Sequence, residues 1–416
     1  MADEKKPEMM AREPAEFKRI IEEMTDYLKN NPTDGPAYHN RGTALLGLSQ
    51  YGAAVADFDM AIELKPDIVE AYINRGAALM SLKRYEAAIA NFDKLIELKP
   101  GYAEAYNIRG SARGNLKQHK TALADFDKAI QLNPDYAEAY NNRGAALKGL
   151  KQYEAAIADL EKAIELKPNY AQAYYNCGNS RYSLEQYEAA IIDFEKAIDL
   201  EPNYADAYFN RGSAHIGLKK YEAAIADFEK AMELRPNDVE AYNNRGAARH
   251  GLAQYETAIA DFEKAMELEP DSATAYNNRG NARSGLKQYE AAITDFGKAI
   301  ELKPDFADAY NNRGCARSEL KQYEPAIADF EKSIELKPHD FHAYNNRGTA
   351  FISLKRYGAA IADFGKAIEL KPDSAEAYNN RGGAYGDLKQ YEAAITDYNK
   401  AIELDPINPS YIHNRA

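Results

Sequence analysis

The chain has 416 residues, of which 45% are hydrophobic, and it carries 31 tyrosines, no tryptophan and a formal net charge of −13. An acidic chain repels polyanions on average, which argues against broad nucleic-acid binding. No stretch approaches the roughly 18 apolar residues that span a membrane, so we expect a cytoplasmic protein.

The N-terminal segment divides into a tail and a helix. Residues 1–13 are charged and lack the apolar run of a secretory signal, so we expect a disordered tail. Residues 14–34 carry, 34 residues early, the apolar pattern that recurs from Tyr51 to Pro66. This predicts a lone helix that covers the first repeat.

A repeat occupies the remainder of the chain. Proline recurs every 34 residues from Pro32 to Pro406. Eleven complete units of 34 residues span residues 35–408 without insertion or deletion, and residues 409–416 begin a twelfth, incomplete unit. A fixed period of this length indicates a solenoid in which each unit packs against its neighbours.

Each unit contains two apolar stripes at helical spacing. In the fourth unit the first stripe runs from Tyr140 to Leu150 and the second from Tyr153 to Leu166. Pro168 cannot continue a helix. The pattern therefore predicts two short antiparallel helices, A and B. A glycine stands inside helix A, where it costs about 1 kcal/mol relative to alanine, so we expect a neighbouring side chain to pack closely against it.

Six positions of the unit carry a family resemblance. In the sixth unit they are Tyr208, Gly212, Ala224, Phe228, Ala231 and Pro236. This pattern resembles the tetratricopeptide-repeat (TPR) family over residues 35–408. The resemblance implies an all-α fold, a right-handed superhelical solenoid of antiparallel helix pairs, and a non-enzymatic protein-binding scaffold. One departure is consistent: arginine replaces the usual leucine before the glycine in ten of the eleven units.

Catalytic and metal-binding signatures are missing from the sequence. It contains no phosphate-binding GK[ST] loop, HExxH or GxSxG motif. His339 and His342 are too few for a metal site, and Cys177 and Cys315 fit no zinc or disulfide spacing. We therefore expect no enzyme activity, no cofactor and no metal.

The resemblance implies that helix A lines a binding groove through positions two, five, six, nine and twelve of each unit. Position six is asparagine in ten of eleven units. This ladder resembles the one in O-linked N-acetylglucosamine transferases, where asparagines hold an extended peptide by its backbone. The alternative is that the asparagines only cap or solvate the groove. The predicted ladder residues are Asn142, Asn176, Asn210, Asn244, Asn278, Asn312, Asn346 and Asn380.

Two other sets complete the predicted groove. Position two is mostly acidic, and an acidic edge favours a neutral or basic partner. Positions five and twelve supply large apolar side chains that are candidate binding anchors, although they could instead pack against neighbouring repeats. The acidic edge comprises Glu138, Asp206, Glu240 and Asp308, and the anchors are Tyr175, Tyr182, Phe209 and Ile216.

We call the ten arginines that precede the helix A glycine the arginine column, and this column has two interpretations. Aspartates on helix B could pair with the arginines in a structural network, or the arginines could bind an anion. We favour the network.

Three functions follow from these patterns. The first is a peptide- or protein-binding scaffold, of which an assembly or co-chaperone-like factor is an example. The second is a targeting module of a larger enzyme such as a glycosyltransferase, and the third is polyanion binding through the arginines. The apolar face of the last complete helix also predicts weak end-to-end self-association.

Overall fold

The computed structural model describes residues 13–415, and every regular element in that part of the chain is an α-helix. The predicted all-α solenoid of antiparallel helix pairs is therefore confirmed. Apart from Glu13, the tail predicted for residues 1–13 lies outside the described residues.

The helix bounds follow the 34-residue period. Helix α2 (Pro14–Asn30) precedes the first repeat, where the lone helix was predicted, and α25 (Pro409–Arg415) follows the last complete repeat. The A helices are α3 (Gly35–Gly47), α5 (Val69–Ser81), α7 (Ala103–Asn115), α9 (Ala137–Gly149), α11 (Ala171–Ser183), α13 (Ala205–Gly217), α15 (Val239–Gly251), α17 (Ala273–Gly285), α19 (Ala307–Glu319), α21 (Phe341–Ser353) and α23 (Ala375–Asp387). The B helices are α4 (Tyr51–Leu64), α6 (Tyr85–Leu98), α8 (His119–Leu132), α10 (Tyr153–Leu166), α12 (Tyr187–Leu200), α14 (Tyr221–Leu234), α16 (Tyr255–Leu268), α18 (Tyr289–Leu302), α20 (Tyr323–Leu336), α22 (Tyr357–Leu370) and α24 (Tyr391–Leu404).

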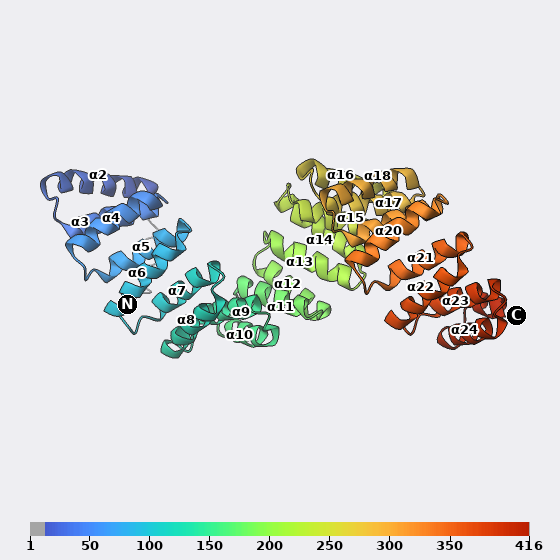
Figure 1. The fold of residues 1–416 in the computed structure, drawn as a ribbon. Helices are drawn as coiled ribbons and strands as arrows, with labels where there is room; N and C mark the ends of the chain where they lie inside the picture. Colours follow the sequence, from blue (N-terminus) through green and yellow to red (C-terminus); the bar gives the residue numbers. More distant parts are fainter. Residues whose placement is uncertain (1–12, 416) are drawn as a thin grey trace. The chain divides into compact units, whose positions relative to one another are not determined.

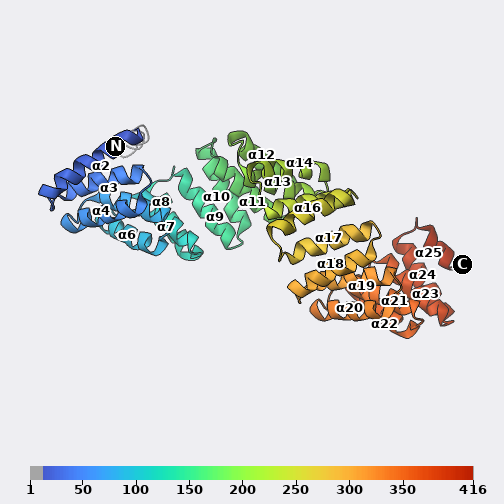
Figure 2. The same ribbon diagram turned by 90° about the horizontal axis from the view of Figure 1, so that it is seen from above.

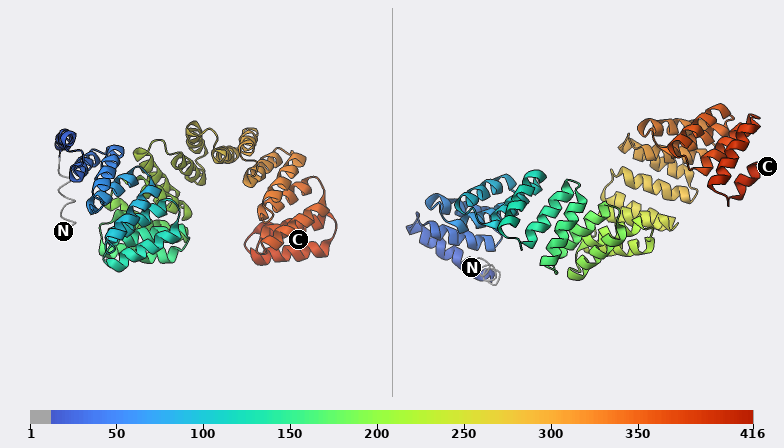
Figure 3. Two further views of the ribbon diagram at one scale, coloured as in Figure 1. Left: turned by 60° about the vertical axis from the view of Figure 1, so that its left-hand side comes forward. Right: turned by 90° about the horizontal axis from the view of Figure 1, so that it is seen from below.

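The 34-residue repeats fall into two larger compact units, one ending at Ala214 and the other beginning at His215. From here on, a repeat is one 34-residue helix pair, and the first and second units are these two larger parts. Within each unit the helix pairs follow one another in chain order (Figure 1, Figure 2), and sequence-neighbouring helices pack together, as α9 and α10 do in the first unit and α17 and α18 in the second. Two further views show the helices following one another along the chain within each unit (Figure 3). Some A helices of successive repeats also touch, as α7 and α9 do in the first unit and α15 and α17 in the second. Side chains of successive A helices are therefore adjacent wherever these helices touch.

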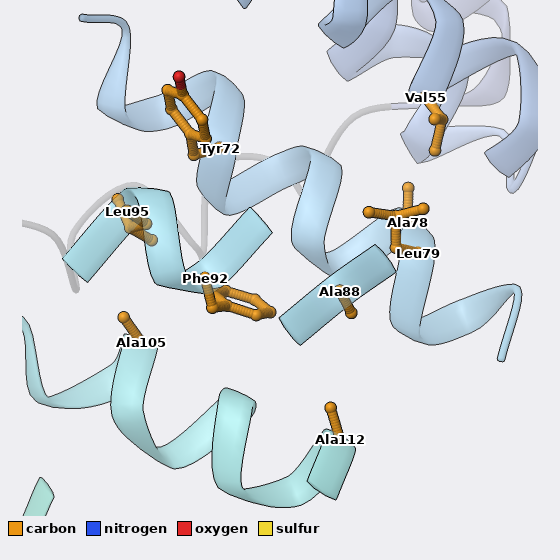
Figure 4. Packing of buried hydrophobic residues seen from close by; sticks show 9 residues of the cluster. All are labelled: Val55, Tyr72, Ala78, Leu79, Ala88, Phe92, Leu95, Ala105 and Ala112. Atoms are coloured by element: carbon orange, nitrogen blue, oxygen red, sulfur yellow. The ribbon is translucent and has the colours of Figure 1, made fainter. Parts of the chain in front are cut away.

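The glycine inside helix A allows the two helices of a repeat to approach closely. A Cβ atom added at Gly110 would lie 2.7 Å from the ring of Phe126, and one at Gly144 would lie 2.7 Å from Leu160. The equivalent Phe92 is fully buried, and its ring lies among the alanines of the adjoining helices (Figure 4). The buried ring occupies the space that a side chain at the glycine would need, which accounts for the glycine in mid-helix.

The turn between helices A and B is closed by a residue in the left-handed region. Lys151 has φ 61°. Its N–H donates to the carbonyl of Lys148, and the N–H of Gln152 donates to the carbonyl of Leu147. These two bonds satisfy carbonyls at the end of helix A that would otherwise lack a partner. Eleven non-glycine residues at this position have φ between 55° and 61°.

The arginine column joins adjacent repeats. Arg143 donates through Nε and Nη2 to the two carboxylate oxygens of Asp159, both at 2.6 Å, and through Nη1 to Asp127 of the preceding repeat at 2.7 Å. The Asp159 hydrogen bond is the main cause of the raised pKa of Arg143. The guanidinium carbon also lies 5.5 Å from the centre of the Tyr140 ring. The arginines thus form the predicted structural ion-pair network.

Candidate functional site

The asparagine ladder is a set of hydrogen bonds between repeats. Asn142 Nδ2 donates to Asn107 Oδ1 of the preceding repeat at 3.0 Å and to Ser111 Oγ at 3.2 Å. Asn176 donates to Asn141 in the same way at 2.9 Å. The same contact recurs between sixth-position and fifth-position asparagines in the second unit, for Asn312, Asn346 and Asn380. Most ladder amides therefore hold one repeat to the next.

Four of the seven fifth-position asparagines are more deeply buried than most of the ladder. Asn107, Asn141, Asn277 and Asn345 are all buried, whereas most ladder asparagines are half-buried. Sequence reasoning treated position five only as a variable groove position. In each pair the acceptor at position five and the donor at the next position six are 35 residues apart, one period plus one, and the period itself does not show that these unlike positions touch.

Two ladder residues of the second unit depart from this pattern. Among the described residues, the Asn244 side chain forms no hydrogen bond. The Asn278 side chain accepts one through Oδ1, but its Nδ2 group donates to no acceptor in the same part of the chain. The Oδ1 atom of Asn243, which would be the acceptor for Asn278, is buried without a partner in the described part of the chain. Both residues lie on A helices that touch each other, α15 and α17.

The predicted apolar anchors differ in their surroundings. The ring centre of Tyr175 lies 4.7 Å from that of Tyr204 and 6.1 Å from that of Phe194, so this ring packs within the protein. Tyr182 is 37% exposed, with its ring edge against Tyr187. Phe209 and Ile216 are half-buried. Tyr182 is thus the most open of the four anchors.

A cavity of about 430 Å³ lies on the helix A face of the first unit. We call it the lysine–tyrosine pocket, and its lining includes Lys148, Tyr175, Asn179, Tyr182, Ser183 and Asn210. Three of these were predicted site residues, and the structure brings them together from α11 and α13. Lys148 and Asn179 were missed, because they stand at position twelve of one repeat and position nine of the next, and the period does not show that these unlike positions meet.

The comparisons with known proteins agree with this architecture. Family models described as tetratricopeptide repeat match residues 39–103, 137–170, 205–238, 228–260, 273–306, 307–340 and 375–408, and one described as TPR repeat matches residues 110–151, 178–218, 254–286 and 348–389. The chain belongs to the tetratricopeptide-repeat family. Among curated proteins, none matches it.

Several solved structures are similar to this chain. The chain of the APC/C hetero-tetramer Cut9–Hcn1 is 14% identical, with 96% of this chain and 93% of that chain covered and a TM-score of 0.53. Yeast Tom70 is 17% identical over 91% of this chain and 94% of its own, with a TM-score of 0.49. YrrB, described as a TPR protein with an unusual peptide-binding site, is 31% identical over 44% of this chain and 95% of its own, with a TM-score of 0.40.

The predicted acidic edge of this TPR protein is partly neutralised. Glu138 accepts a hydrogen bond from Lys167 Nζ at 2.7 Å, and Asp308 accepts one from Lys337 Nζ at 2.9 Å. Burial, with a smaller contribution from Glu138, raises the pKa of Tyr170 to about 12. Glu240 is exposed, and the residue equivalent to those lysines in its repeat is Glu269. The edge therefore keeps its negative charge at Glu240.

The cysteines have structural positions. Cys177 stands where the other ten repeats have the arginine of the arginine column. It is fully buried, and burial raises the pKa of its thiol. Cys315 accepts a hydrogen bond from Asn346 at 3.3 Å, and burial raises its pKa to about 11. Within residues 13–415, no cluster of three or more potential ligands could hold a metal, and no helix is long and apolar enough to cross a bilayer.

Proposed function

We propose that this protein is a non-enzymatic scaffold whose helix A face binds an extended protein segment by its backbone. The observation that carries the proposal is the pair of ladder amides, Asn244 and Asn278, whose NH₂ groups have no acceptor among the described residues. An asparagine amide offers both a donor and an acceptor, which matches the groups of a peptide unit.

The buried carbonyl between these amides supports the proposal. Asn243 Oδ1 has no partner within the described residues. An unsatisfied buried acceptor costs about 1–3 kcal/mol, and because this atom is closed to solvent, its side chain must turn outward before a backbone N–H of the partner can recover that free energy. By contrast, the NH₂ groups of Asn142, Asn210 and Asn346 each already contact two acceptors within the protein. Backbone binding is therefore assigned to repeats seven and eight rather than to the whole ladder.

The charge around this site favours a neutral or basic segment. Glu240 stands at position two of the same repeat as Asn244 and keeps its charge, because no lysine stands at the equivalent of Lys167. A basic side chain beside the bound backbone would find a carboxylate there.

A peptide selection tests the proposal. Random twelve-residue peptides displayed on phage are selected on the full chain, and the best are synthesised and titrated by calorimetry. An Asn244→Ala, Asn278→Ala double variant should bind them at least tenfold more weakly, as expected for the loss of two or more hydrogen bonds. Asn142→Ala is the matched control, because its amide is already used within the ladder. Equal affinity of the double variant and the wild type would refute the proposal.

A further inference from the structure

We infer that a column of tyrosines on the first unit binds a proline-rich segment in the polyproline II conformation. Each of these tyrosines is the last residue of its repeat and immediately precedes the next helix A, and the tyrosine column comprises Tyr102, Tyr136, Tyr170 and Tyr204. The inference rests on the proposed function insofar as the helix A face receives an extended segment. It goes beyond that function by naming a second place on this face and a class of ligand.

The fold does not require tyrosine at this position. Residues 134–144 and 372–382 have the same sequence, except that Tyr136 in the first segment corresponds to Ser374 in the second. Ser374 caps helix α23 by accepting a hydrogen bond from the N–H of Ala377 at 3.3 Å. The tyrosines before α7, α9 and α11 form no such cap, so these helices begin without a stabilising contact that serine supplies. A local rule that is broken without architectural need indicates a functional position.

The tyrosine column lies at the junctions between consecutive A helices. The Tyr136 hydroxyl accepts a hydrogen bond from Asn107 Nδ2 at 3.2 Å, and the Tyr204 hydroxyl donates to Gln172 Oε1 at 2.9 Å. Asn107 and Gln172 stand at positions five and two of the preceding repeats, and these positions line the predicted groove. All four tyrosines are half-buried, so each ring keeps part of its surface open to a partner.

The spacing of the tyrosine column matches a polyproline II helix. Helix α7 touches α9, and α9 touches α11. Helices in contact lie about 8–10 Å apart, so equivalent rings on them are separated by a similar distance. A polyproline II helix has three residues per turn and advances about 9 Å per turn. A proline at every third residue would therefore meet successive tyrosines, and aromatic rings are the surfaces on which such segments dock.

The hydrogen-bonding groups beside the tyrosine column also suit proline. Asn107 is committed within the protein, because it donates to Tyr136 and accepts from Asn142 at 3.0 Å. The Tyr136 hydroxyl donates to no acceptor among the described residues, and the Tyr170 hydroxyl forms no hydrogen bond there. Burial is the main cause of the raised pKa of both phenols, so both remain protonated donors near neutral pH. A proline-rich segment supplies carbonyl acceptors and, at its prolines, no N–H that needs an acceptor.

The charge beside the tyrosine column favours a basic residue among the prolines. Glu104 forms no ion pair in the described part of the chain, and Asn133 stands where the next repeat has Lys167 to pair with Glu138. Glu104 lies close enough to Tyr136 to contribute to the raised pKa of that phenol. An arginine at every third residue of the segment would find this carboxylate beside the rings.

Synthetic peptides test this inference on the full chain. The probe is a fluorescently labelled twelve-residue peptide of the repeat Pro-Pro-Arg, acetylated at its N-terminus, amidated at its C-terminus and titrated by fluorescence anisotropy. It should bind more tightly than a six-residue version, which spans fewer tyrosines. A Gly-Gly-Arg peptide of the same length should bind at least about tenfold more weakly, because it keeps the charge but lacks the proline rings and the preformed helix. Equal affinity of the two twelve-residue peptides, or no binding of either, would overturn the inference.

A double variant locates the binding site. Tyr136→Ser, Tyr170→Ser reproduces the cap of Ser374, so its urea midpoint should be no lower than that of the wild type, while its affinity for the Pro-Pro-Arg peptide should fall at least about tenfold. Tyr136→Phe, Tyr170→Phe keeps the rings and should weaken binding by a smaller factor. Phe306→Ser changes the same position in the second unit and is the matched control, which should bind as the wild type does. Unchanged affinity of the double serine variant would overturn the inference.

The remaining outcomes separate this inference from its alternatives. Tighter binding of an oligosaccharide, such as a hexamer of N-acetylglucosamine, that is lost in the double serine variant would overturn the assignment of a proline-rich ligand. Selected peptides that require Asn244 and Asn278, together with a Pro-Pro-Arg peptide that does not bind, would overturn this inference alone. A Pro-Pro-Arg peptide that requires the tyrosine column, together with selected peptides that bind the Asn244→Ala, Asn278→Ala variant normally, would overturn the backbone site alone.

Discussion

Asn176 Nδ2 lies 2.9 Å from Asn141 Oδ1 of the preceding repeat, and both side chains are more than nine-tenths buried, at 8% and 3% exposure. A hydrogen bond in such a place contributes more to stability than one at the surface, because neither group can turn to water when its partner is removed. The ladder residues thus divide into those that join repeats and those that are open to a partner.

This division predicts unequal effects on stability of one substitution at two ladder positions. Asn176→Ala leaves the Asn141 carbonyl unsatisfied and should lower stability by about 1–3 kcal/mol. Asn244→Ala should change it by less than about 0.5 kcal/mol, as expected where no contact is lost. Because repeat arrays can unfold in parts, amide hydrogen exchange in α9 and α11 is the appropriate measurement. Equal effects of the two variants would contradict the division.

The left-handed turn offers a stabilising change. An L-residue at φ 61° is strained by about 1–2 kcal/mol, part of which Lys151→Gly should recover after the entropy cost of glycine. We expect a gain of up to about 1 kcal/mol, read from the urea midpoint. The adjacent Gln152 has φ −91°, so Gln152→Gly should instead destabilise the protein. A loss of stability in Lys151→Gly would show that the lysine side chain matters more than the backbone.

Cys177 interrupts the arginine column, and restoring the arginine should stabilise the fifth repeat. In the seventh repeat, Arg245 and Arg249 together contact Asp261 and Glu229, whereas in the fifth Arg181 alone contacts Asp193 and Glu161. Burial is the main cause of the raised pKa of Asp193.

The Cys177→Arg variant should lower the pKa of Asp193 and add about 1–2 kcal/mol of stability near neutral pH. The carboxyl pKa is measured by NMR titration. The control Cys177→Met fills the site without charge and should leave that pKa raised. An unchanged pKa in Cys177→Arg would mean that the new guanidinium does not reach Asp193.

His39 makes the stability of the first repeats depend on pH. Its Nε2 atom lies 3.3 Å from Asn74 Nδ2, so the ring must be neutral to accept that bond, and burial is the main cause of its lowered pKa. The unfolded chain therefore binds the proton more readily, and this contribution to stability is lost as pH falls below about 6.5.

Other repeats show how to remove this dependence. His39→Asn reproduces the asparagine acceptor of the third and fourth repeats and should reduce the loss of stability between pH 7.5 and pH 5. Exchange rates in α3 and α5 provide the measurement, and the exposed His339→Asn is the control. A pH dependence identical to that of the wild type would exclude His39 as its source.

The predicted self-association remains open to a direct test. Tyr391, Ile395 and Ile412 are exposed by 58%, 47% and 47%. Light scattering of the 416-residue chain should show weak association that increases with concentration and decreases in an Ile395→Lys variant. A constant monomer mass at high concentration would contradict the expectation.

The fold could be predicted from the sequence because every repeat has the same apolar stripes and the same glycine and proline positions. Pro168 ends helix B and the fixed period aligns eleven copies, so helix positions and even the arginine–aspartate pairs could be anticipated. The contacts of Asn141 could not, because a period aligns equivalent positions but does not show which unlike positions touch across a repeat boundary. The pocket around Lys148 was missed for the same reason, since it combines different positions of consecutive repeats.

The two-sided contacts of Arg143 affect how the array unfolds. Because this side chain binds Asp159 of its own repeat and Asp127 of the one before, unfolding either repeat exposes a carboxylate that has lost its counter-charge. Each folded repeat thereby raises the free energy needed to melt its neighbour, as in a one-dimensional chain of coupled elements. At Cys177 that coupling relies on Arg181 alone. Thermal melting should accordingly divide the first unit into cooperative blocks, with the boundary at the fifth repeat.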